Sequence, residues 1–115
     1  GKVFEFHANG QKKGETGYKD GKRDGPVVVW HENGQKHVEA SYKDGKYDGF
    51  WTMWCEKGQK NSELNFKDGK PDGLTVSWHE NGKNRTEINY KDGTVISSKY
   101  WNSKGEEVDS LEEAE

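Results

Sequence analysis

The chain lacks the features that mark several common protein classes. No long apolar run is present, which excludes a transmembrane helix and a signal peptide within these residues. Cys55 is the only cysteine, so an internal disulfide is excluded and the compartment stays undetermined. Basic residues do not outnumber acidic ones, since 18 Lys and Arg face 21 Asp and Glu with the signs interleaved. We therefore expect neither a nucleic-acid partner nor membrane insertion.

Aliphatic residues are also scarce, and aromatic residues take their place. Only 28% of the 115 residues are hydrophobic, which is little for a two-layer core, yet 12% are aromatic, which is too many for a disordered chain. The length suits one domain. The aromatic side chains must therefore supply most of the buried area.

A repeat of 24 residues organises the sequence. Its blocks are 25–48, 49–72 and a third that starts at Gly73, and 1–24 is an earlier copy. The in-step positions include glycines, tryptophans and glutamates, at Gly34, Gly58 and Gly82, at Trp30, Trp54 and Trp78, and at Glu39, Glu63 and Glu87. Self-similarity of this length indicates one supersecondary unit per block, which needs its neighbours for burial. A start on the repeat boundary is compatible with a segment of a longer array or with chance.

Each block contains two runs of alternating residues separated by two turns. In 26–31, Pro26, Val28 and Trp30 point one way while Val27, Val29 and His31 point the other. A similar alternation follows in 36–42, which is typical of strands and not of helices. We predict an all-β fold, a repeat array of antiparallel β-hairpins in one elongated, twisted meander sheet of about nine or ten strands. The array spans 1–105, and 106–115 form an acidic C-terminal tail or cap.

The parity of the first turn predicts which residues share a face. A two-residue turn would mix apolar and polar side chains, whereas a three-residue loop 32–34 pairs His31 with Gln35 and Val28 with Val38. Such a loop needs a left-handed third residue, which is Gly34. On this register Trp54 is buried on the core face and Glu63 is exposed on the opposite, polar face. The second turn, 43–49, has no type that the sequence alone assigns.

The pattern Gly-x-x-x-x-Trp-x-x-x-Gly-Gln-Lys followed by Tyr-Lys-Asp-Gly-Lys-x-Asp-Gly resembles the MORN repeat, and more closely its bacterial variant. The resemblance covers residues 1 to about 105. It implies an elongated β-hairpin array that acts as a binding scaffold, and related bacterial proteins are associated with antitoxins of toxin–antitoxin systems. Some eukaryotic MORN proteins are linked to membrane attachment, but the charge of −3 argues against that role here.

Four repeated positions resemble chemical sites, and each also has a structural interpretation. One position holds His7, His31, Cys55 and His79, but successive copies lie about 9–10 Å apart on strand spacing, too far to share a zinc ion. The glutamates Glu15, Glu39, Glu63 and Glu87 form a row with the spacing of an inverting glycosidase pair, but no cleft is evident beside them. The turn aspartates, Asp44, Asp48 and their copies, do not have the spacing of a calcium-binding loop. The tryptophan row suits a quaternary amine or, as we favour, core packing. We therefore expect no enzyme, no cofactor and no metal.

An apolar patch interrupts the predicted polar face. It consists of Val27, Val29, Trp51 and Met53, next to Thr75 and Ser77 of the following copy. Aromatic residues and Met are favoured at the centres of interfaces, although packing against the tail or a turn is the alternative.

We predict a non-enzymatic repeat module that binds a protein partner through this patch. In the antitoxin-like version it covers the active surface of a toxin and is cytoplasmic. The alternative is a structural repeat segment of a larger secreted or surface protein, whose signal peptide has been removed and which has no discrete ligand.

Overall fold

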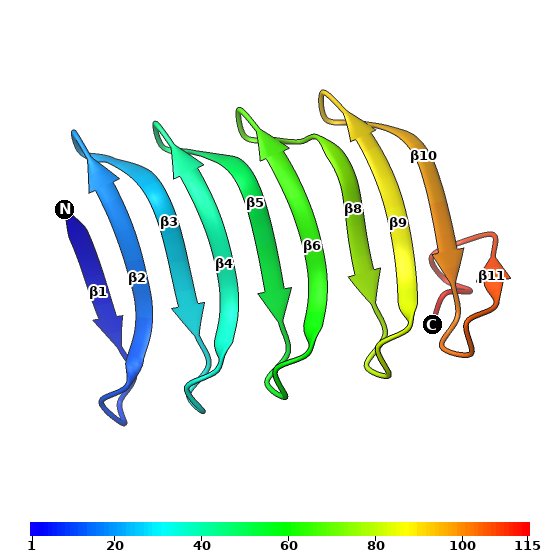
Figure 1. Cartoon of the computed structure of the whole chain (residues 1–115), viewed down its shortest axis with the longest axis horizontal. Coiled ribbons are helices and arrows are strands. Elements are labelled where there is room, and N and C mark those ends of the chain that lie inside the picture. The colour runs from blue at the N-terminus through cyan, green and yellow to red at the C-terminus, as the bar shows by residue number, and fades with distance from the viewer.

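Two kinds of turn alternate along the chain and fold it into one open antiparallel sheet (Figure 1). The computed structural model describes all 115 residues. Its strands are β1 (Lys2–Phe6), β2 (Lys12–Lys19), β3 (Lys22–Trp30), β4 (Lys36–Lys43), β5 (Lys46–Trp54), β6 (Lys60–Lys67), β7 (Lys70–Pro71), β8 (Gly73–Trp78), β9 (Asn84–Lys91), β10 (Thr94–Trp101) and β11 (Glu107–Val108). Neighbours in sequence are neighbours in the sheet, except that β6 pairs with both the short β7 and β8. The predicted all-β meander of hairpins is confirmed.

The first turn of each block is the predicted three-residue loop. The His31 N–H donates to the Gln35 carbonyl at 2.8 Å, and the Gly34 N–H donates to the His31 carbonyl at 3.0 Å. Gly34 has φ 87, the left-handed value that this loop demands of its third residue. The Asn33 side chain accepts a hydrogen bond from the Gln35 N–H at 3.0 Å, and this local bond stabilises the turn.

The second turn is a two-residue hairpin of type I′. Lys43 pairs with Lys46, and the residues between them, Asp44 and Gly45, both have positive φ, at 50 and 83. The Gly45 N–H donates to the Arg23 carbonyl of the preceding block at 2.8 Å, and Gly69 and Gly93 make the equivalent bond. These turns therefore tie neighbouring blocks together at one edge of the array.

The predicted register is wrong by one residue because β4 contains a β-bulge. Trp30 pairs with Lys36, but Val29 pairs with Val38, so His37 is the extra residue. A bulge places two residues opposite one and inverts the alternation beyond it. Val28 is consequently opposite Glu39 and not opposite Val38. The same shift recurs between β5 and β6 and between β8 and β9.

The inverted alternation exchanges the side chains of the two faces. We call one the groove face, because it carries Val27, Val29, Val38, Ala40 and Trp51. We call the other the charged face, because it carries the glutamate row and the tryptophan row together, namely Glu15, Glu39, Glu63 and Glu87 with Trp30, Trp54 and Trp78.

The prediction that Trp54 is a buried core residue is therefore wrong. Trp54 is partly exposed, and the ammonium of Lys36 lies 5.8 Å from its ring centroid. Lys36 also forms an ion pair with Glu39 at 2.6 Å, three residues along the same strand. The side chain of Glu63 is 40% exposed and pairs in the same way with Lys60. Glu15 also pairs with a lysine of its own strand, Lys12, whereas Glu87 accepts from the Asn84 amide at 3.2 Å. The bulge brings the side chains of each pair to one face.

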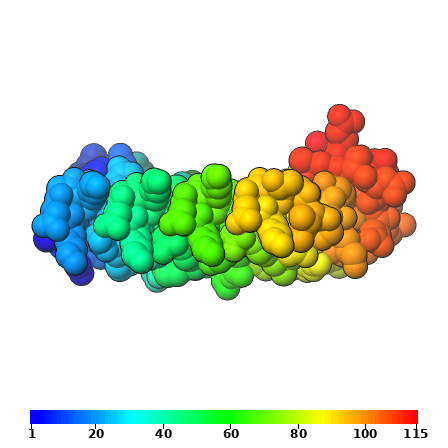
Figure 2. Space-filling view, turned by 90° about the horizontal axis from the view of Figure 1, so that it is seen from above, coloured from blue at the N-terminus to red at the C-terminus, as the bar shows by residue number.

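Burial is sparse because the sheet has no second layer. Only four side chains are buried, Ala40, Tyr42, Thr86 and Ala114. The molecule measures 45 × 35 × 15 Å, and its edge-on view shows a single layer from which the C-terminal segment projects (Figure 2). No helix long and apolar enough to cross a membrane occurs in it.

A ladder of side-chain hydrogen bonds joins the three-residue loops of neighbouring hairpins. The imidazole of His31 bonds through Nε2 to the Trp54 carbonyl at 3.1 Å, and the Asn33 amide donates to the Glu56 carbonyl at 2.8 Å. His7 with Asn9, and His79 with Asn81, make the equivalent pairs of bonds. A carbonyl only accepts, so each Nε2 carries a proton. The histidines therefore have a structural role.

Acidification should weaken the fold through His37. Its ring stacks on His31 with centroids 4.2 Å apart, and partial burial, followed by the charge of His31, lowers the pKa of His37 below its usual 6.5. As the pH falls through 6.5, the unfolded chain takes up this proton first, so stability is present above that pH and is lost below it.

Thermal melts between about pH 8 and pH 5 should show the melting temperature falling with pH, and His37→Gln should reduce the slope. An identical slope in the two proteins would contradict this assignment. Glu56, whose charge favours protonated His37, supplies a second check, because Glu56→Gln should steepen the fall.

Candidate functional site: an apolar groove on one face of the sheet

An apolar groove of about 380 Å³ runs across the groove face from β1 to β5. Its apolar walls and floor are formed by Val27, Val29, Val38, Ala40, Tyr42, Tyr47 and Trp51. Charged side chains also line it, namely Glu5, Lys13 and Arg23. The groove therefore combines an apolar centre with a charged rim, which is the usual composition of a protein interface.

The depth of the groove comes from one small side chain. Ala40 pairs with Val27 on one side and with Trp51 on the other, and it is 1% exposed. In the later copies Leu64 and Ile88 occupy the same repeat position. Ala40 is thus smaller than the residues at its later copies, and the groove that it lines lies in the N-terminal half of the array.

Aromatic rings that pack at a tilt lie at the type I′ turn end of the groove. The rings of Tyr42 and Tyr47 lie 4.4 Å apart, and Tyr47 lies 5.0 Å from Phe66. The guanidinium of Arg23 donates to the Tyr42 hydroxyl at 3.3 Å and lies 5.4 Å from its ring. Burial raises the pKa of the Tyr42 phenol, which therefore stays neutral at physiological pH. The Tyr42 side chain thus positions the guanidinium of Arg23 at the rim of the groove.

Three of the four predicted binding residues line this groove. Val27, Val29 and Trp51 do so, whereas Met53 lies beside it, opposite Val38. All four side chains are partly exposed. Their predicted place on a polar face is wrong, since the bulge puts them with Val38 and Ala40 on the apolar face.

Sequence reasoning missed several groove residues that the structure adds. Ala40, Tyr42 and Tyr47 were not singled out, although Tyr42 falls in the repeated alternation. The available signal was the change from Ala40 to Leu64 and Ile88 at one repeat position, because a small residue among large ones leaves a hollow.

Comparison with known families supports the repeat assignment. The MORN repeat variant family matches residues 1–20, 23–44 and 71–92, which together make up more than half of the chain. No curated protein matches the chain. The family is a non-catalytic repeat module. The chain therefore belongs to the MORN repeat variant family.

Proposed function

We propose that the chain binds a protein partner through the groove. The observation that carries the proposal is an apolar groove left open on a sheet without a second layer, with Trp51 partly exposed in its wall on β5. Tryptophan and tyrosine dominate the binding energy of protein interfaces because they bury a large area at little entropic cost. A repeat array of this kind presents such a surface without chemistry of its own.

The rim indicates which partner segment fits. Lys13 and Arg23 outnumber Glu5 around the apolar centre, so an apolar anchor flanked by an acidic residue is the complementary surface. In the antitoxin-like version of the proposal the partner is a toxin, and the chain inhibits it by covering its active surface. The second candidate, a structural repeat segment without a ligand, is favoured by the open array but leaves the groove without a role.

Trp51→Ala should weaken partner binding by about 2 kcal/mol, roughly 30-fold in Kd, as truncation of interface anchors does. The partner would first be captured from the native host on immobilised chain and then purified. Calorimetric titration of that partner against wild-type and variant chains measures the loss.

Trp54→Ala is the matched control, because it removes the same side chain from the opposite face. It should leave the affinity within about twofold, since Trp54 points away from the groove. Equal affinities of wild-type chain and Trp51→Ala for a captured partner would contradict binding through the groove. If Trp51→Ala does not weaken the binding of any captured partner, the structural alternative is favoured.

A further inference from the structure

One of the four loop-to-loop junctions lacks both rungs of the side-chain ladder. In the block 49–72 Cys55 stands at the histidine position and Lys57 at the asparagine position. Neither side chain donates a hydrogen bond to the next loop, where Trp78 and Glu80 carry the equivalent carbonyls. The segments that match the family leave out 45–70, which contains this loop.

The side chain that covers the loop glycine at the other junctions is also missing at this one. A methyl group added at Gly34, Gly58 or Gly105 would lie within 4 Å of a side chain of the preceding loop. At Gly82, the equivalent glycine of the fourth loop, the added methyl group would have no neighbour within 4 Å. The Gln59 side chain therefore does not cover Gly82 in the loop 80–82, whereas the Gln35 side chain covers Gly58 in the loop 56–58.

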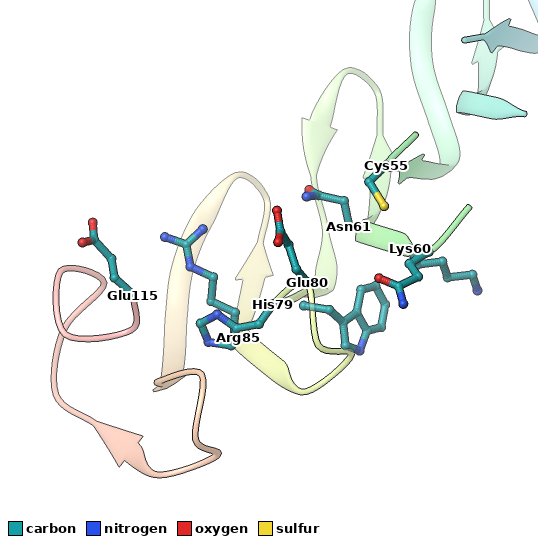
Figure 3. Close-up of a pocket in the computed structure, with 9 residues that line it drawn as sticks. Cys55, Lys60, Asn61, His79, Glu80, Arg85 and Glu115 are labelled. Atoms are coloured by element: carbon teal, nitrogen blue, oxygen red, sulfur yellow. The ribbon is translucent and has the colours of Figure 1, made fainter. Parts of the chain in front are cut away.

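The open junction contains two adjoining hollows of about 310 and about 500 Å³. Cys55, Gln59 and Glu80 line both of them. Figure 3 shows Cys55 and Asn61 on one side of this crevice, and Glu80 and Arg85 on the other. The crevice is thus much larger than the two side-chain tips that fill the other junctions.

The chemistry of the crevice favours a neutral hydrogen-bond donor. Its carboxylates are balanced by cationic groups, with Glu56, Glu80 and Glu115 set against Lys57, Lys60 and Arg85. Two backbone carbonyls, of Trp78 and Glu80, occupy the positions that accept N–H groups from imidazole and amide at the other junctions. The Nε of Arg85 is buried without a hydrogen-bond partner at the same place.

We propose that this crevice binds the imidazole or carboxamide side chain of a partner protein, which supplies in trans the donor that Cys55 and Lys57 do not supply in cis. The N–H of a neutral imidazole or carboxamide can donate to one of the two carbonyls, while its acceptor atom can accept from a cationic group of the lining. The proposal rests on the protein partner of the proposed function but concerns a different surface from the groove.

Free imidazole and acetamide, held above the pKa of imidazole so that both are neutral, are the probes. Titrated into isotope-labelled chain, they should produce saturable amide shifts at His79, Asn81 and Gly82. The variant that restores the rungs, Cys55→His with Lys57→Asn, should abolish these shifts. It should also melt about 4–8 °C higher, because it adds two hydrogen bonds between the blocks.

His31→Ala with Asn33→Ala serves as a positive control, because it removes the rungs of the neighbouring junction and should create imidazole shifts there. The proposal would be overturned if this control responds but the crevice at Cys55 and Lys57 shows no shifts. It would also be overturned if the shifts are unchanged in the variant Cys55→His with Lys57→Asn.

With the purified partner in hand, the restored variant should bind it about tenfold more weakly, whereas unchanged affinity would overturn the partner as the source of the donor. Trp51→Ala should leave the imidazole shifts intact, which separates failure of the crevice from failure of the groove.

Discussion

Tyr42→Ala should lower the free energy of unfolding by about 3–5 kcal/mol, the range for an aromatic side chain lost from a packed site. Tyr42 is 9% exposed in a molecule that buries almost nothing else. Its ring, on β4, packs on Tyr47 of β5, and Tyr47 in turn packs on Phe66 of β6. The truncation would therefore remove an aromatic contact that joins β4 to β5 on the groove face.

Chemical denaturation followed by tryptophan fluorescence measures this loss. Tyr90→Ala is the matched control, since Tyr90 occupies the same repeat position but is only partly buried. It should cost clearly less than Tyr42→Ala. Tyr42→Phe keeps the ring and removes only the bond from Arg23, so it should cost about 0.5–1.5 kcal/mol. Equal losses for Tyr42→Ala and Tyr90→Ala would show that the aromatic cluster of Tyr42, Tyr47 and Phe66 is not a local centre of stability.

Gly58→Val should cost about 3 kcal/mol, the second largest effect that we expect of a single substitution. Gly58 has φ 88, a conformation that a β-branched residue adopts only under strain. A Cβ at this position would also lie 2.6 Å from the Oε1 atom of Gln35 in the preceding loop. Gln35 is exposed and this atom is the far end of its flexible side chain, so the glutamine can move aside at small cost and the backbone strain accounts for most of the loss.

Gly82→Val separates the two contributions. Gly82 has nearly the same backbone conformation, with φ 85, but nothing within 4 Å of an added methyl group. It should therefore show only the strain, and cost slightly less than Gly58→Val, when both variants are melted in parallel. A loss at Gly82 as large as that at Gly58 would mean that contact between the loops contributes nothing.

Much of the fold was predictable from the sequence because its signals are local and repeated. The 24-residue period fixes the unit, and the alternation in 26–31 indicates strands. Gly34 at the third position of a short loop predicts its left-handed conformation, which the structure confirms. These inferences need only one hairpin, and the copies confirm them independently.

The assignment of the two faces failed for a reason that lies between strands. A single extra residue, His37, reverses every side chain beyond it, and no composition rule marks a polar residue as a bulge. The sequence therefore predicts Val28 opposite Val38, whereas the structure pairs Val28 with Glu39. The groove residues could still be grouped, since Val27, Val29 and Trp51 move together whichever face they occupy.

The type I′ turn was hidden by its context. Asp44 and Gly45 form the common two-residue hairpin, but a further bulge follows at Gly49, whose φ is 96. In the sequence the two features merge into one long polar stretch. The crevice at Cys55 and Lys57 was hidden as well, because the bonds that these residues fail to make exist only between hairpins.

The simple neighbour-to-neighbour order of the strands has a mechanical consequence. Every extensive contact between strands joins members that are adjacent in the sheet, so no part of the chain clamps two distant parts together. Tension applied to the two ends would separate neighbouring blocks one joint at a time, at low force. The rupture order would follow the coupling of adjacent blocks, and the joint without ladder bonds, after Cys55, would open before the joints on either side of it.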